Sequence, residues 1–79
     1  MVRERVFSAF KEALDLDGQV DTSSLVYRDF PKWTSMAHMT LISILEQDFD
    51  AMLETDDVLN MSNFEKAVEI MSKYAVAAA

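Results

Sequence analysis

Apolar residues recur every three or four positions over the first fourteen residues of the chain. Val2, Val6, Phe10 and Leu14 lie about one helical turn apart, and most positions between them are charged or small. This period matches the 3.6 residues per turn of an α-helix, which gives the segment one apolar and one solvated face. The pattern predicts a first helix from Val2 to Leu14. The turn-forming aspartates after it, and Gly18 with its freedom to adopt a positive φ, are expected to end it.

The next helical pattern begins only at Ser35, which leaves a long connection over residues 15–33. Apolar residues are spread along it, so we expect the connection to be anchored to the core and to hold a short turn of helix. These anchors are Leu16, Val20, Leu25, Tyr27, Phe30 and Trp33. Pro31 disfavours helical geometry at the preceding residue, so the second helix has to begin after it.

Residues 35–48 form the most apolar segment and predict the second helix. Apolar side chains lie almost all round it, which indicates one face in the core and another available to a partner. The expected core side chains are Met36, Leu41, Leu45 and Phe49, together with Ile42 or Ile44. Met39 and Ser43 are expected nearer the surface.

Two more helices are predicted in the second half of the chain. Thr55 is the expected cap of a short helix over residues 55–59, which has aspartates in its first turn. Ser62 and Glu65 have the spacing of a capping box, in which each side chain bonds the backbone N–H of the other residue. They predict a last helix, and residues 75–79 are expected to fray from its end. Its expected buried face carries Phe64, Ala67, Val68, Met71 and Tyr74.

The composition indicates one small helical domain over residues 1–79. Hydrophobic residues make up 51% and charged residues 27%, which is typical of a folded chain, and a single Gly and a single Pro disfavour a β-rich fold. No cysteine is present, so the chain has no thiol of its own. The N-terminal pattern is amphipathic, and no segment approaches the roughly 18 apolar residues of a membrane span. We therefore expect a cytoplasmic protein that does not bind membranes.

Charge is distributed unevenly along the chain. The formal net charge of −7 argues against nucleic acid and anionic membranes as partners, because both attract Lys and Arg. From Trp33 to Glu65 there is no Lys or Arg, and this stretch contains seven acidic residues. Elsewhere the seven basic residues offset seven acidic ones. A basic protein surface is therefore the expected partner.

The order of the predicted elements and the residues around Ser35 resemble the acyl carrier protein family over essentially the whole chain. In that family an Asp-Ser-Leu signature opens a central helix that continues through apolar and acidic positions. The matching residues here are Thr34-Ser35-Met36, His38-Met39, Leu41-Ile42, Leu45-Glu46, Phe49-Asp50 and Glu54-Thr55-Asp56-Asp57. The resemblance implies an all-α fold: a small four-helix, acyl-carrier-like bundle with three long helices, one short helix and a long first loop.

The resemblance also implies that Ser35 bears a 4′-phosphopantetheine arm, moved from coenzyme A by a phosphopantetheinyl transferase. Such a monomeric carrier is not an enzyme. It holds acyl or related intermediates as thioesters and delivers them to acyl-loading and acyl-accepting enzymes of a biosynthetic pathway. Thr34 stands where the family usually has Asp. With this departure, the sequence is similar to specialised bacterial carriers. The expected docking residues, which would meet basic patches on partners, are Thr34, Met36, Met39, Glu46, Asp48, Asp56 and Asp57.

Other interpretations are open at this stage. Ser35 is a candidate helix cap, a role compatible with any function. The chain is alternatively an unmodified interaction module with an acidic face. A hydrolase using Ser35 and His38 is a third interpretation, but the sequence offers no third orienting residue and no oxyanion hole. We expect no metal site, because His38 is the lone His and the Asp15-Leu16-Asp17-Gly18 segment lacks the first and last ligands of an EF-hand loop.

Overall fold

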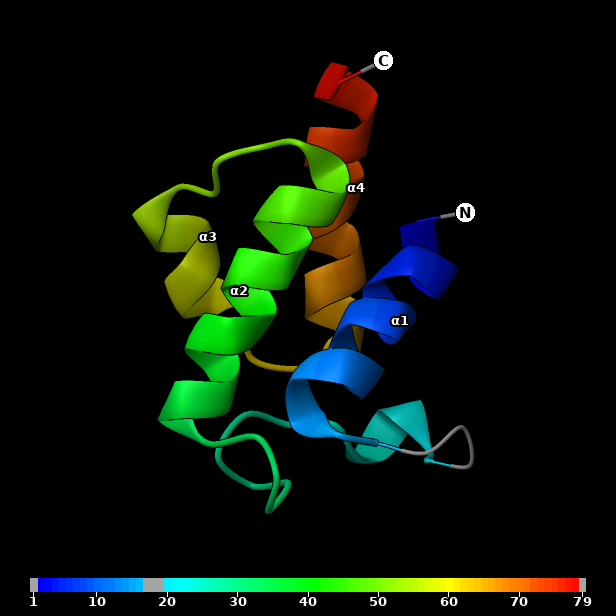
Figure 1. Ribbon diagram of the computed structural model, residues 1–79, viewed down its shortest axis with the longest axis vertical. Helices are drawn as coiled ribbons and strands as arrows, with labels where there is room; N and C mark the ends of the chain where they lie inside the picture. Colours follow the sequence, from blue (N-terminus) through cyan, green and yellow to red (C-terminus); the bar gives the residue numbers. More distant parts are fainter. Residues whose placement is uncertain (1, 17–19, 79) are drawn as a thin grey trace.

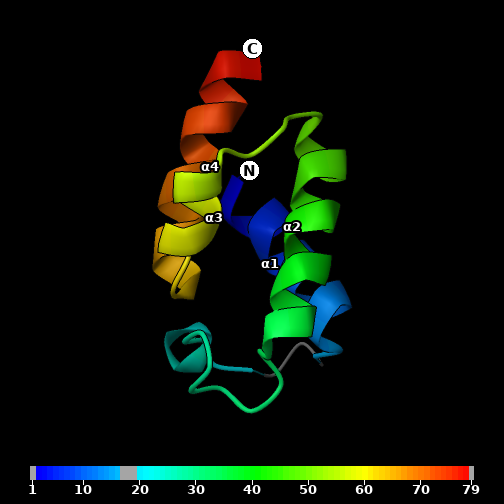
Figure 2. The same cartoon turned by 90° about the vertical axis from the view of Figure 1, so that its left-hand side faces the viewer.

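The structure, a computed structural model, describes residues 2–16 and 20–78, and this part of the chain contains four α-helices. The three long helices α1 (Val2–Leu14), α2 (Ser35–Phe49) and α4 (Phe64–Ala78) lie side by side, with the short helix α3 (Thr55–Asn60) at the edge (Figures 1 and 2). A 3-10 turn, η1 (Thr22–Ser24), lies in the connection between α1 and α2. The predicted all-α bundle of three long helices and one short one, with a long first loop, is therefore confirmed.

Helix α1 ends at Leu14 as predicted, and the residue that ends it is Asp15. Its φ of 55° is left-handed, and the Leu16 N–H donates to the Lys11 carbonyl at 2.9 Å. This bond is the long-range bond of a Schellman C-cap. Aspartate tolerates left-handed geometry better than most residues with a side chain. Gly18, which was also expected to help end this helix, lies outside the described residues.

One hydrophobic cluster joins α1, α2, α4 and the long connection. At its centre the Phe10 ring meets Trp33 edge-on with centroids 4.9 Å apart, and it meets Phe64 in the same manner at 5.2 Å. Such edge-to-face pairs add to the free energy gained by burial alone. The predicted anchors are confirmed, because Leu25 and Trp33 are fully buried and the other four pack against the cluster.

Helix α2 differs from prediction in its first turn. The side chain of Met36 is 80% exposed instead of buried, whereas that of His38 is only 8% exposed. Helical spacing explains the difference, since residue 38 lies on the same face as the buried residues and residue 36 lies opposite. Met39 and Ser43 are exposed as expected. The other buried side chains of α2 are Leu41, Ile42, Leu45 and Phe49, also as expected.

The predicted cap of α3 is wrong by one residue. Thr55 is already the first helical residue, and the cap position is Glu54, whose side chain makes no capping bond. No side chain of α3 is fully buried. Polar contacts with the neighbouring helices, described below, therefore contribute to its placement.

The predicted capping box of α4 is also wrong. The cap is Asn63, whose Oδ1 accepts the Lys66 N–H at 2.7 Å. The Glu65 side chain turns away to Arg3, with which it makes two hydrogen bonds of 2.8 and 2.7 Å. A partner from another helix thus competes successfully for the glutamate, and the neighbouring asparagine, an equally good cap, takes its place.

The end of α4 also differs from expectation. The helix continues to Ala78, so residues 75–78 are helical where we expected fraying, while Ala79 lies outside the described residues. Alanine is the strongest helix former, which favours helical geometry over these residues.

The long connection is tied to the start of α4. Val26 and Asn63 form an isolated antiparallel bridge. The Tyr27 N–H donates to the Ser62 carbonyl at 2.9 Å, and the Phe64 N–H donates to the Leu25 carbonyl at 3.1 Å. The connection therefore closes the end of the bundle at which α2 and α4 begin (Figure 1).

Within the described residues, the length and apolarity that a membrane span requires are not found in any helix.

Candidate functional site

Ser35 is the first residue of α2, and its side chain is exposed. The helix cap is Thr34, whose Oγ1 accepts the Ala37 N–H at 3.2 Å. The interpretation of Ser35 as the cap of this helix is therefore wrong. Because its neighbour satisfies the helix end, the Ser35 hydroxyl is not used for capping.

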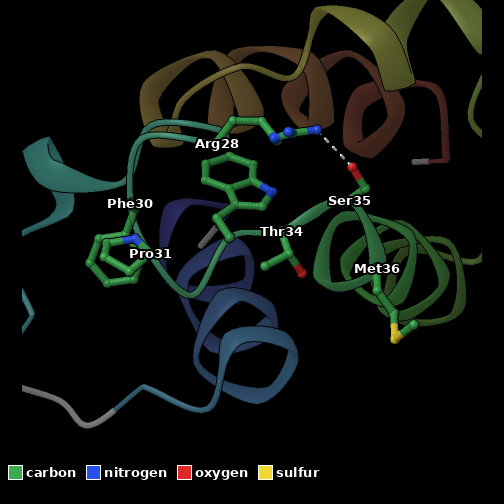
Figure 3. Close-up of a pocket in the computed structure, with 7 residues that line it drawn as sticks. Arg28, Phe30, Pro31, Thr34, Ser35 and Met36 are labelled. Carbon is green, nitrogen blue, oxygen red and sulfur yellow. Dashed lines mark hydrogen bonds between the residues drawn. The ribbon is translucent and has the colours of Figure 1, made fainter.

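Two side chains of the long connection bond the Ser35 hydroxyl. The Tyr27 Oη lies 3.1 Å from the Ser35 Oγ, and the Arg28 Nη1 donates to the same Oγ at 3.2 Å. In Figure 3 the Arg28 side chain reaches toward Ser35, whereas Met36 points away from it. The bond with Ser35 lowers the pKa of the Tyr27 phenol, and Arg28 lowers it further against the opposing effect of desolvation.

The backbone of Arg28 has an unusual conformation. Its φ is 68°, in the left-handed region that few residues other than glycine adopt. The Arg28 N–H donates to the Trp33 carbonyl at 3.2 Å, and the Phe30 N–H donates to the Val26 carbonyl at 2.9 Å. These bonds close the loop on itself and hold the arginine beside α2.

The residues around Ser35 form a surface cavity of about 480 Å³. Figure 3 shows Phe30 and Pro31 at the far side of the loop from Ser35, so the cavity combines an apolar end with a polar end. Its volume lies within the range of small-ligand sites. The lining residues are Arg28, Phe30, Pro31, Trp33, Thr34, Ser35 and Met36.

His38 is buried with both ring nitrogens bonded. The Trp33 Nε1 donates to the His38 Nδ1 at 3.0 Å, and the His38 Nε2 lies 3.0 Å from the Val58 carbonyl oxygen. Because a carbonyl only accepts, Nε2 is the donor in that bond, and Nδ1 is the acceptor for Trp33. The histidine thus links the long connection, α2 and α3. Neither nitrogen is free to take a proton from Ser35, so this geometry does not form the pair that the hydrolase interpretation requires.

Five of the predicted docking residues are exposed. Met36 and Met39 are 80% and 62% exposed, which is unusual for large apolar side chains on one helix. Thr34, Asp48 and Asp56 are exposed as well.

The two remaining docking candidates have partners within the chain. The Glu46 Oε2 accepts the Leu53 N–H at 2.9 Å and so stabilises the connection after α2. The Asp57 carboxylate accepts from the Tyr74 hydroxyl and, at 3.1 Å, from the Lys73 ammonium. Its side chain is only 16% exposed. Their contacts are therefore structural, and Asp48 and Asp56 are the accessible acids of the predicted set.

Tyr27 and Arg28 are site residues that the sequence analysis missed. Tyr27 was expected only as an anchor of the loop, and Arg28 stood out in no pattern. No periodic signal connects positions in an irregular loop, so their approach to Ser35 depends on the folded loop alone.

No group of three His, Cys, Asp or Glu side chains that could hold a metal ion occurs within residues 2–16 and 20–78.

A scan against protein-family models found no matching family, and searches of curated proteins and of solved structures found no match to this chain. The resemblance to acyl carrier proteins stays a prediction that depends on the residues around Ser35.

Proposed function

We propose that the protein is a carrier whose Ser35 bears a 4′-phosphopantetheine arm. The observation that supports this proposal is the exposed Ser35 hydroxyl, which the helix does not need for capping and which Arg28 approaches at 3.2 Å. The surroundings fit the group. Arg28 and Tyr27 are donors suited to a phosphate, and Phe30 and Pro31 offer an apolar wall to the rest of the arm.

Loading the arm requires coenzyme A and a phosphopantetheinyl transferase. The Ser35 Oγ attacks the β-phosphorus of coenzyme A, and the new Oγ–P bond replaces the bond from that phosphorus to the bridging oxygen. Adenosine 3′,5′-bisphosphate leaves with the electron pair, and the hydroxyl proton passes to the transferase. The arm supplies the thiol that this chain lacks, on which acyl groups are held as thioesters.

The residues of the chain hold the nucleophile in place. Thr34 caps α2 and thereby orders the turn that begins with Ser35. The positive end of the helix favours the negative charge of a phosphodiester there by about 0.3–1 kcal/mol. Presentation of the hydroxyl is therefore the task of this chain, and the transferase supplies the chemistry.

The charge distribution suits brief encounters with several enzymes. A carrier has to bind and leave its transferase and its acyl-loading and acyl-accepting partners quickly. Complementary charge raises association rates more than affinity. Asp48 and Asp56, both exposed, are the acids proposed to meet basic side chains on these cytoplasmic partners.

Modification is the direct test of this proposal. The purified chain, incubated with coenzyme A, Mg²⁺ and a broad-specificity phosphopantetheinyl transferase, is expected to gain the mass of one arm in intact mass spectrometry. Ser35→Ala should gain nothing. Ser43→Ala, which removes another exposed hydroxyl of α2, should gain the arm as the parent does.

Absence of a mass gain with every transferase tried, including any encoded beside the gene, would instead favour an unmodified interaction module. For that alternative, the exposed Met36 and Met39 near an acidic surface are the supporting observation. Modification that persists in Ser35→Ala would contradict the assigned position.

A further inference from the structure

Arg28 is a cation without a carboxylate partner in the described part of the chain. Its side chain donates to the neutral Ser35 hydroxyl and also interacts with the Tyr27 hydroxyl. Arg3, Lys66 and Lys73 each pair with a carboxylate, whereas Arg5 and Lys32 donate to backbone carbonyls, and Arg28 donates to a side-chain hydroxyl. A guanidinium gains much more from an anionic oxygen than from a hydroxyl, because charge-assisted hydrogen bonds are about twice as strong as neutral ones.

The loop holds the guanidinium in place at a conformational cost. The left-handed backbone of Arg28, with φ of 68°, is disfavoured for a residue with a side chain. The surrounding hydrogen bonds and the buried Trp33 stabilise this conformation. The result is an exposed side chain that reaches the first turn of α2 (Figure 3).

Tyr27 completes the arrangement from the same side. Its hydroxyl lies 3.1 Å from the Ser35 Oγ, and its ring packs against Trp33 with centroids 5.8 Å apart. The phenol and the guanidinium thus converge on one oxygen from adjacent positions of the loop. A phosphate on that oxygen would place its non-bridging oxygens two bonds further out, on the side from which both donors approach.

We infer that Arg28 and Tyr27 form a phosphate site that binds the phosphodiester on Ser35 and fixes the first segment of the arm. This inference rests on the proposed modification of Ser35. A phosphate held there would place the start of the arm in the cavity whose apolar wall includes Phe30 and Pro31. Arg28 and Tyr27 are positioning residues in this role, since the transferase carries out the chemistry.

The test compares modified and unmodified protein. For the parent, the arm should raise the midpoint of urea unfolding by roughly 0.3–1 M at low salt, and added NaCl should reduce the rise. Arg28→Gln should show a rise clearly smaller than the parent, because only the helix end then favours the phosphodiester, and Tyr27→Phe should also show a smaller rise than the parent. Arg28→Gln keeps a long side chain with N–H donors but removes the charge.

Lys32→Gln is the matched control. Lys32 is a second cation of the same loop, and its ammonium donates to the Asp15 carbonyl at 3.0 Å instead of to Ser35. Its removal changes the net charge equally, so Lys32→Gln should keep the full rise on modification. A rise in Arg28→Gln equal to that in Lys32→Gln and the parent would overturn the inference.

A second measurement requires only the parent. The Nε–H resonance of Arg28 in ¹⁵N NMR should shift on modification, and its exchange with water should slow at least threefold. An unchanged resonance would overturn the inference, even if Arg28→Gln cannot be modified or does not fold. A parent that gains no mass contradicts the proposed function itself, whereas a modified parent without these effects contradicts the phosphate site alone.

Discussion

At the scale of single residues, Thr34 and Ser35 have separate roles at the start of α2. Thr34 satisfies a backbone N–H of the helix through its Oγ1, and Ser35 leaves its hydroxyl exposed. The aspartate usual at position 34 in acyl carrier proteins would cap the helix as well as threonine does. Compared with the signature that the sequence resembles, Thr34 therefore lacks a charge but keeps the cap.

This separation predicts the effect of substitutions at Thr34. Thr34→Asp should keep the stability and raise the rate at which a generic transferase modifies Ser35, because the carboxylate helps to orient the transferase and its metal. Thr34→Asn, which caps without charge, should keep the rate of the parent. Thr34→Ala should lower the free energy of unfolding by about 1 kcal/mol.

Initial rates from intact mass spectrometry and urea unfolding would measure these effects. If Thr34→Asp is modified no faster than Thr34→Asn, the missing carboxylate is not what limits a generic transferase.

At the scale of elements, α3 is held by polar contacts with two helices. The His38 ring bonds the Val58 carbonyl from α2, and the Asp57 carboxylate accepts from Tyr74 and Lys73 of α4. The Tyr74 hydroxyl and then the Lys73 ammonium hold the pKa of Asp57 below its usual range, against a smaller effect of desolvation. The ionised carboxylate is therefore part of what attaches this short helix.

This attachment predicts a dependence on pH. Because the pKa of Asp57 is lower in the folded than in the unfolded state, its charge stabilises the fold above the unfolded-state pKa. That stabilisation is lost as the pH falls through the folded-state value. Asp57→Asn should thus lower the urea midpoint at pH 7, and its difference from the parent should shrink as the solution is acidified below about pH 4.

Asp56→Asn is the control for the charge of the first turn of α3, since Asp56 has no partner within the described residues. It should change the midpoint little. A difference between Asp57→Asn and the parent that is constant from pH 7 to pH 3 would contradict the assigned contribution of the ionised pair.

At the scale of the whole molecule, one stretch of the chain is acidic, and in the rest of the chain acidic and basic residues are equal in number. The stretch from Trp33 to Glu65 has no Lys or Arg, and Arg28 and Lys32 precede it in the sequence. Under the proposed function, this charge would attract a basic partner to α2 and α3. Fields of this kind act on association rates and weaken with ionic strength.

We predict that Asp48→Asn and Asp56→Asn each lower kcat/KM for modification by up to about fivefold at low salt, with little effect near 1 M NaCl. Glu12→Gln, an equal charge change on the exposed face of α1, should have a smaller effect. The rates are measured with the same transferase over a range of NaCl concentrations. Equal effects of all three substitutions would indicate net charge rather than a docking surface.

The sequence by itself determined the four helices, the anchored first loop and most of the core, because these depend on local propensity and on the period of apolar residues. Leu41, Leu45 and Trp33 were buried as predicted for that reason. The tertiary structure alone decided which polar side chains pair with each other by hydrogen bonds. The capping box of α4 gave way to the pair of Arg3 with Glu65, which lie 62 residues apart.

The candidate site also combines a part that local sequence features predict with a part that depends on long-range contacts. Ser35 was identified from the sequence, because the start of an apolar helix is a local feature. Tyr27 and Arg28 reach its hydroxyl only because the loop before α2 is tied to the start of α4 and folds back on itself. Long-range closure of an irregular segment leaves no period in the sequence, so the chemistry around the serine becomes visible only in the folded chain.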